Sequence, residues 1–211
     1  MSIQDVANAS QTSKLLKAAA GPLAVVLRGV EHSNSRVRVN AVAASSQLTQ
    51  DKPLIAQHAF LVIITRLTDY DSDVRRASLV ALGELGVQAV VHAGSIAERL
   101  EDDDETVREA AVQTLGNMEA HAVPHAVARL EHDEANVRIA ALQVLGALSS
   151  EHAATHVDAI AARLRDDEEE VKLAAVVVLM SLGALPATQN AALSEYNAEF
   201  AALIWDFGMG F

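Results

Sequence analysis

The chain repeats one pattern of apolar and polar positions at intervals of 30 to 37 residues. Each copy begins with a polar or acidic turn. A Val and a basic residue follow, then small residues three and four positions after that Val, and usually a Leu eight positions after it. The marker valines are Val37, Val74, Val107, Val137 and Val171. A period of this length predicts one pair of helices per copy, stacked on the next pair.

The segment after each marker Val has the spacing of an amphipathic helix, here called a B helix. Positions 0, 3, 4, 7, 8 and 11 from the Val form one apolar stripe, which predicts the buried face. In the third copy this stripe consists of Val107, Ala110, Ala111, Thr114, Leu115 and Met118. The apolar segments before the turns are also spaced as helices, here called A helices. The predicted A and B pairs cover 14–30 and 34–49, 53–68 and 71–86, 88–100 and 104–118, 121–131 and 134–148, and 153–165 and 168–183.

Differences between the copies predict the domain organisation. We expect a repeat array over 1–186, with a degenerate first repeat at about 14–50 and further repeats at about 53–86, 88–118, 121–148 and 153–183. The last B helix is apolar nearly all round, so another element must cover it. Residues 187–211 contain five of the seven aromatic residues. This segment is expected either to cap the array as a further helix or to anchor another subunit, through Tyr196, Phe200, Trp205 and Phe207.

Composition and charge narrow the function classes. The 211 residues are 51% hydrophobic, which allows a large core that a repeat array spreads along an axis. A net charge of −12 argues against nucleic acid, whose phosphates must be neutralised by Lys and Arg. No apolar run of about 18 residues predicts a membrane span, and residues 1–5 lack the features of a secretory signal. We therefore expect an intracellular, cytoplasmic protein with a protein partner. The absence of cysteine excludes disulfides and thiolate metal sites.

Two surfaces are candidates for binding that partner. The turns between A and B helices hold 16 of the 28 acidic residues, and stacking would align them into a ridge that attracts a basic protein segment, whereas an apolar segment would bind the patch described next. The alternative is that these acids only cap and stabilise helix N-termini. The outward positions of the last two B helices form an apolar patch. The ridge candidates are Asp102, Asp103, Asp104, Asp166 and Asp167, and the patch candidates are Ile139, Gln143, Leu173, Val177 and Met180.

The third copy reads D-x-x-x-x-V-R-x-A-A-x-x-x-L-G from Asp102 to Gly116. Asp69 and Asp166 also stand five residues before their Val, whereas His32 and His132 replace this Asp in the first and fourth copies. Over about residues 28–183 the pattern resembles the HEAT-repeat family, in particular the short repeats also known from phycobilin lyases. The resemblance implies an all-α, right-handed superhelix, B helices lining its concave side, and an Asp/Arg ladder between repeats.

Signatures of catalysis are absent from the sequence. There is no G-x-S-x-G, no phosphate-binding glycine loop and no H-E-x-x-H, so we expect no catalytic residues, no cofactor and no metal site. The predicted function is a non-catalytic scaffold or adaptor in a larger assembly. The alternative is a lyase or chaperone subunit that acts on a bilin-type protein. A new visible absorption band after addition of pigment and acceptor protein would distinguish the two.

Overall fold

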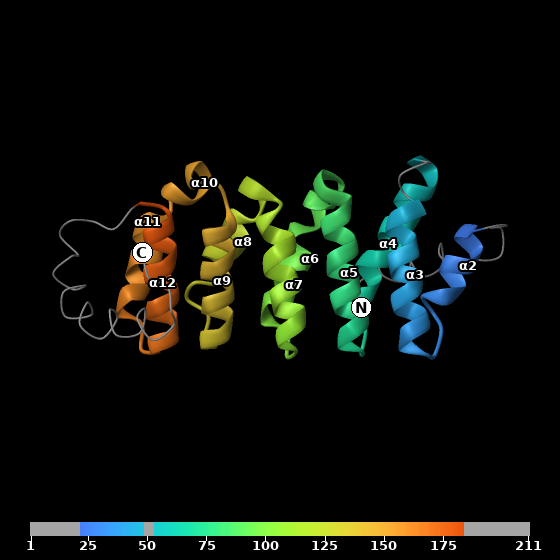
Figure 1. The fold of residues 1–211 in the computed structure, drawn as a ribbon, viewed down its shortest axis with the longest axis horizontal. Coiled ribbons are helices and arrows are strands. Elements are labelled where there is room, and N and C mark those ends of the chain that lie inside the picture. The colour runs from blue at the N-terminus through green and yellow to red at the C-terminus, as the bar shows by residue number, and fades with distance from the viewer. Residues whose placement is uncertain (1–21, 49–52, 184–211) are drawn as a thin grey trace, which may run out of the picture.

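The computed structural model describes residues 22–48 and 53–183, and these residues form helices without any strand. The helices stand side by side in one row, which makes the molecule elongated (Figure 1). The B helices are α3 (Ser35–Leu48), α5 (Ser72–Leu85), α7 (Glu105–Gly116), α9 (Ala135–Ala147) and α12 (Glu169–Ser181). The A helices are α2 (Pro22–Gly29), α4 (Pro53–Arg66), α6 (Ala93–Ala97), α8 (Val123–Val127), α10 (Ser150–Ala154) and α11 (Val157–Ala162).

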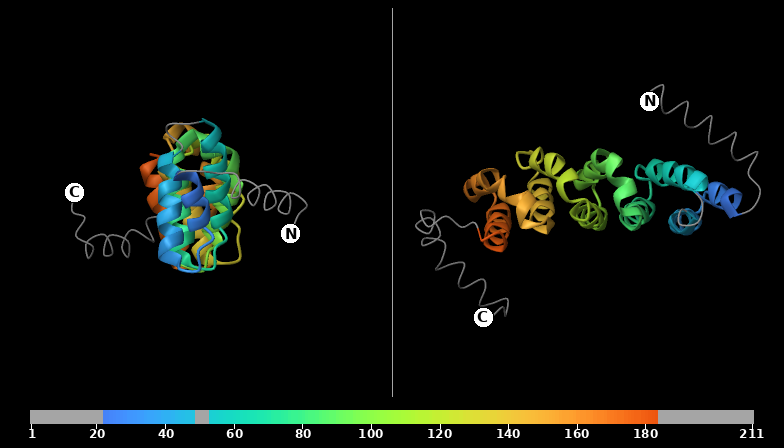
Figure 2. Two further views of the ribbon diagram at one scale, coloured as in Figure 1. Left: turned by 90° about the vertical axis from the view of Figure 1, so that its right-hand side faces the viewer. Right: turned by 90° about the horizontal axis from the view of Figure 1, so that it is seen from above.

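The two kinds of helix form two layers. Along the row each B helix packs against the next one, α3 against α5 and so on to α12, and the A helices lie behind them (Figure 2). The predicted α-solenoid is therefore confirmed. The predicted starts of the first A helix and of the repeat array lie outside the described residues, as does the segment 187–211 with its cap or anchor residues.

The B helices agree with their predicted ranges because the stripe positions are buried between the layers. Val74, Val107, Val137 and Val171 are at most 1% exposed, and Ala111 and Ala141 are fully buried. Two caps begin these helices as expected, because Asp71 accepts the N–H of Asp73 and Asp104 that of Thr106. Val37 is only half-buried, which fits the weak first copy.

Glycine allows neighbouring B helices to come together at two places. A Cβ on Gly116 would lie 3.0 Å from the Cβ of Ala147, and a Cβ on Gly146 would lie 3.0 Å from Cγ2 of Val178. Both distances are shorter than ordinary van der Waals contact. The glycine nine residues after the marker Val therefore serves close packing in the third and fourth copies.

The A helices of the later repeats are shorter than predicted. Instead of one helix over 88–100, the structure has a 3₁₀ helix at Gly86–His92, then α6, then a 3₁₀ helix at Glu98–Glu101. The range 153–165 is likewise divided between α10, α11 and the 3₁₀ turn Arg163–Arg165. Apolar residues three and four apart fit both an α-helix and a 3₁₀ helix, so spacing could not distinguish the two.

By length and composition, the helical run 72–101 would be long and apolar enough to cross a membrane. In the structure it is not one continuous helix, since α5 ends at Leu85 and the next residue, Gly86, has a φ of 55°. Leu79, Leu82 and Ile96 of this run are fully buried in the core between the layers. The run is accounted for by the core of the solenoid and is weak evidence for a membrane span.

Candidate functional site

A row of buried ion pairs links successive repeats at the turns between A and B helices. In the pair of Arg75 and Asp102, Nη2 and Nε donate to the two carboxylate oxygens at 2.6 and 2.8 Å. In every pair the Arg belongs to one repeat and the Asp to the next, and their side chains are at most 10% exposed. The pairs are Arg38 with Asp69, Arg75 with Asp102, and Arg138 with Asp166. The Asp/Arg ladder implied by the sequence resemblance is present.

The same residues also shape the turns. The carboxylate of Asp102 accepts the backbone N–H of Asp104 at 3.1 Å, and Asp69 and Asp166 make the equivalent bond in their turns. Nη1 of Arg75 donates to the backbone carbonyl of Asp69 in its own turn at 2.9 Å. One buried pair therefore fixes a turn and a repeat junction together.

Asp102 and Asp166 are consequently not part of an exposed binding surface, contrary to the prediction. Both are committed to an Arg of the preceding repeat, which keeps their carboxylates out of water. Asp103 and Asp167, by contrast, are 92% and 88% exposed although each also contacts the ladder Arg. Asp104 is partly exposed and caps α7. Whether these exposed acids bind a partner stays a prediction.

The ion pairs shift the pKa values of their members. Burial by itself raises the pKa of Asp102, but hydrogen bonds from Arg75 and from the N–H of Asp104 outweigh it, so the pKa lies below its ordinary value. The same balance, with Arg138 as the donor, lowers the pKa of Asp166. At Asp104, hydroxyl hydrogen bonds from Thr106 and Ser72 lower the pKa to about 2.

These shifts predict acid sensitivity. Because folding lowers the pKa of Asp102 and Asp166 from 3.8, their contribution to the free energy of unfolding is fully present above about pH 4 and lost as the pH falls through the lowered values. Urea unfolding measured between about pH 2 and 6 should show this loss. Asp102→Asn should make the loss of stability at low pH less steep. If the parent and Asp102→Asn lost the same free energy of unfolding at low pH, the role of the Asp102 carboxylate in the ion pair would be contradicted.

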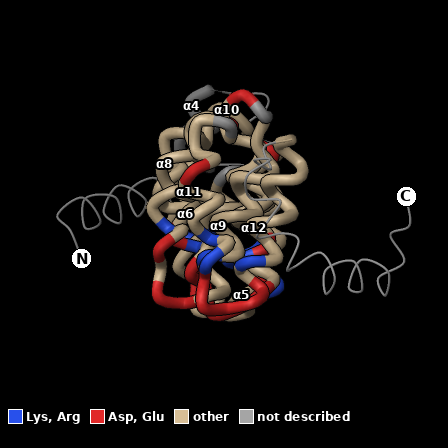
Figure 3. The backbone as a smooth tube through the Cα atoms, turned by 90° about the vertical axis from the view of Figure 1, so that its left-hand side faces the viewer, with Lys and Arg blue, Asp and Glu red and all other residues tan. Residues whose placement is uncertain are grey.

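Apart from the buried aspartates, the acidic residues of the A-to-B turns are accessible to solvent. They lie together along one edge of the molecule (Figure 3). In the same view, backbone segments of Lys and Arg lie next to this edge, toward the middle of the molecule. We call this surface the acidic edge. It consists of Asp73, Glu101, Asp103, Asp104, Glu105, Glu131, Asp133, Glu134, Asp167, Glu168, Glu169 and Glu170.

The outward face of the B helices, here called the B-layer face, is less apolar than predicted. Val177 and Met180 are 58% and 42% exposed, and Gln143 is exposed beside them. Ile139 and Leu173 are half-buried, and Ile139 packs against the core. The predicted patch is thus reduced mainly to two apolar side chains on α12.

Two pairs of histidines, His121 with His125 and His152 with His156, are spaced four residues apart. Among the described residues, no group of three or more His, Asp or Glu side chains lies together in a way that could hold a metal ion. His121 lies in a 3₁₀ turn and His125 in α8, so the two rings are not on one continuous helix. His152 and His156 are likewise divided between α10 and the start of α11. Burial lowers the pKa of His92, whose ring lies 4.9 Å from that of Phe60.

A polar cluster that the sequence pattern does not reveal lies on the opposite edge, where B helices lead into A helices. Glu119 has a φ of 50°, a left-handed conformation uncommon outside glycine. Its Oε2 lies 3.2 Å from Nδ1 of His152, and Oγ of Ser149 lies 2.7 Å from the same nitrogen. Because both oxygens meet Nδ1, the cluster has no nucleophile-base-carboxylate relay, which uses both ring nitrogens. It is a contact between two turns.

Comparison with known proteins agrees with the repeat pattern. Residues 60–133 match the HEAT repeats family, and none of the curated proteins matches the chain. The N-terminal domain of MAST/Orbit is 19% identical over 84% of this chain and 96% of that chain, with a TM-score of 0.59. A designed armadillo repeat protein in complex with the peptide (KR)4 is 18% identical over 82% of this chain and 86% of that chain, with a TM-score of 0.47.

The similarity to MAST/Orbit, at this identity, concerns the fold alone. The residues matched by the family model include two of the marker valines, Val74 and Val107. Such repeat solenoids typically serve as scaffolds for protein interaction and are typically not catalytic. The described residues form an α-solenoid, and residues 60–133 of it match HEAT repeats.

Proposed function

We propose that this solenoid is a non-catalytic scaffold that binds a Lys- and Arg-rich protein segment along its acidic edge. The observation that carries the proposal is the row of exposed carboxylates at the same side of successive A-to-B turns (Figure 3). Charges aligned in this way raise the local concentration of a basic partner and its association rate. The B-layer face around Val177 and Met180 is proposed as a second contact.

Helix capping explains only part of this acid content. In the third repeat Asp104 provides the cap of α7, which leaves Glu101 and Asp103 without a capping role. In the last repeat Glu168 occupies the cap position of α12 and makes no capping hydrogen bond from its side chain. The acids there still stabilise the helix N-terminus through its dipole, but they exceed what that interaction requires.

The spacing of the repeats defines the partner further. Neighbouring packed helices lie about 8–10 Å apart, and an extended chain advances about 3.3 Å per residue. A segment that runs along the acidic edge would therefore meet a new turn about every three residues. We expect basic side chains in the partner at that interval.

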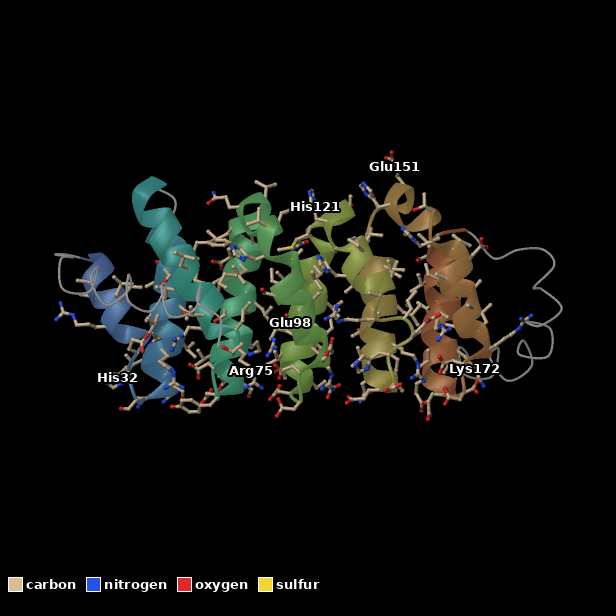
Figure 4. All side chains as sticks on the ribbon, turned by 180° about the vertical axis from the view of Figure 1, so that it is seen from behind. His32, Arg75, Glu98, His121, Glu151 and Lys172 are labelled. Atoms are coloured by element: carbon tan, nitrogen blue, oxygen red, sulfur yellow. The ribbon has the colours of Figure 1, made fainter. Side chains whose placement is uncertain are left out.

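Charge reversal at the exposed turn positions tests the proposal. The triple variant Glu105→Lys, Asp133→Lys and Glu170→Lys changes exposed acids of the acidic edge whose side chains do not contact a ladder Arg. It should lower the association rate of the basic partner at least tenfold at low salt. The matched control is Glu98→Lys, Glu151→Lys and Asp158→Lys, which changes the net charge equally at exposed acids outside the acidic edge. Figure 4 labels Glu98 at mid-height and Glu151 on the opposite edge.

The partner for this assay is the protein recovered by co-purification and identified by mass spectrometry. Association rates measured at several salt concentrations should separate the two triple variants, with the control close to the parent. If both variants lowered the association rate equally, the effect would come from the net charge of the protein and not from the acidic edge. That result would overturn the proposal. Val177→Asp in the same assay tests the second contact. The lyase alternative and the cytoplasmic location stay predictions.

A further inference from the structure

The junctions between neighbouring repeats are not all stabilised by the same kind of ion pair. Three of them, between the first and second, second and third, and fourth and fifth repeats, contain a buried Arg–Asp pair at the A-to-B turns. The third repeat places Arg108 at the same position as those arginines. Nη1 of Arg108 donates to the backbone carbonyls of Asp102 and Asp103, as the ladder arginines do in their own turns. The Arg108 side chain is therefore oriented as in the other repeats.

The fourth repeat offers no carboxylate to Arg108, because His132 occupies the position of the ladder aspartate. Nδ1 of His132 accepts the N–H of Glu134 at 3.1 Å. The imidazole thus replaces the Asp in shaping the turn but not in binding the Arg of the previous repeat. Among the described residues, the ion pair that crosses this junction between Arg and Glu is Arg129 with Glu101, at 2.7 Å. Glu101 is 40% exposed, and an ion pair open to water holds two elements together only weakly.

Helix packing at the junction between the third and fourth repeats is also weaker than at the other junctions. α7 and α9 contact each other less extensively than the other neighbouring B helices do. Their close approach lies near their C-terminal ends, at Gly116 and Ala147. On that side Glu119 also reaches across to Ser149 and His152. The two repeats are therefore held together on the side where B helices lead into A helices. On the side of the acidic edge, fewer contacts restrain their relative movement.

We propose that the junction between the third and fourth repeats is a hinge. Its pivot is the contact of Gly116 with Ala147, and its opening side is the unfilled ladder position between Arg108 and His132. Rotation there changes the distance between the acidic turns of the third and fourth repeats and hence the curvature of the molecule. This inference concerns the unbound chain and does not depend on the proposed function.

Distance measurements between spin labels test the hinge in the full chain. The chain has no cysteine, so pairs of introduced cysteines carry the only labels. The test pair is Asp73→Cys with Asn136→Cys, which spans the hinge, and the control pair is Arg36→Cys with Thr106→Cys, which spans two fastened junctions. All four positions are exposed and precede their marker Val by one residue. Both pairs should be about 20 Å apart, two interhelical distances.

The expected result is a broader distance distribution for the test pair than for the control pair. His132→Asp supplies the missing carboxylate and should narrow the test distribution to the width of the control. His32→Asp is the matched control substitution, since His32 accepts the N–H of Asn34 in the same way but lies in the first repeat, away from the hinge. Equal widths in the parent, or no narrowing with His132→Asp, would overturn the hinge.

Discussion

Arg75→Ala is expected to lower the free energy of unfolding by about 3 to 5 kcal/mol, because it removes one partner of a buried ion pair. Asp102 would keep its charge in a site where its side chain is 2% exposed. The backbone carbonyl of Asp69 would also lose its donor. Urea unfolding followed by circular dichroism at neutral pH measures the change.

Two arginines of this chain serve as controls for Arg75→Ala. Arg76 follows directly but is exposed, and among the described residues it pairs with Asp73 at 3.4 Å, so Arg76→Ala should change stability by less than about 0.5 kcal/mol. Arg108→Ala should cost less than Arg75→Ala, because it leaves no buried carboxylate behind. Adding Asp102→Asn to Arg75→Ala should restore part of the stability. Equal effects of Arg75→Ala and Arg76→Ala would refute the assigned role of the pair.

Leu145→Ala should destabilise the protein by about 2 to 5 kcal/mol, the usual cost of truncating a buried Leu. Leu145 occupies the eighth position after Val137 and is fully buried in the core. In a solenoid each repeat contacts only its neighbours, so the cavity would weaken the fourth repeat and its two junctions first. Urea unfolding gives the total, and hydrogen exchange of α9 amides gives the location.

Gln143→Ala is the control on the same helix, since Gln143 is exposed on the B-layer face. Its effect should stay within about 0.5 kcal/mol. If Leu145→Ala were no more destabilising than Gln143→Ala, the conclusion that the apolar stripe of the fourth repeat is buried would be wrong.

The B helices could be predicted from the sequence because the spacing of their apolar residues fits an α-helix and no other regular structure. Residues such as Val107, Ala111 and Leu115 recur at spacings that only an α-helix places on one face, and each of them is fully buried. The A helices could not be delimited in the same way. Segments as short as α8 take their shape from the neighbours they pack against, and local spacing carries little information about that.

The acidic turns illustrate the same limit for the candidate site. Asp102 and Asp103 are adjacent, identical residues in the sequence, yet one is buried beneath Arg75 and the other is exposed. The first was predicted to be part of a binding surface, and that was wrong. Only the previous repeat, 27 residues earlier in the chain, provides the arginine that distinguishes them.

The repeat register, the helical class and the replacement of Asp by His132 are all written in the local order of residues, because helix periodicity acts over a few positions. The division of acids into buried and exposed, the weak junction at Arg108 and the contact of Glu119 with His152 follow only from folding. Each depends on groups about 30 residues apart that stacking brings together. Burial and ion pairing are properties of that assembled neighbourhood, so they exist only once the repeats are stacked.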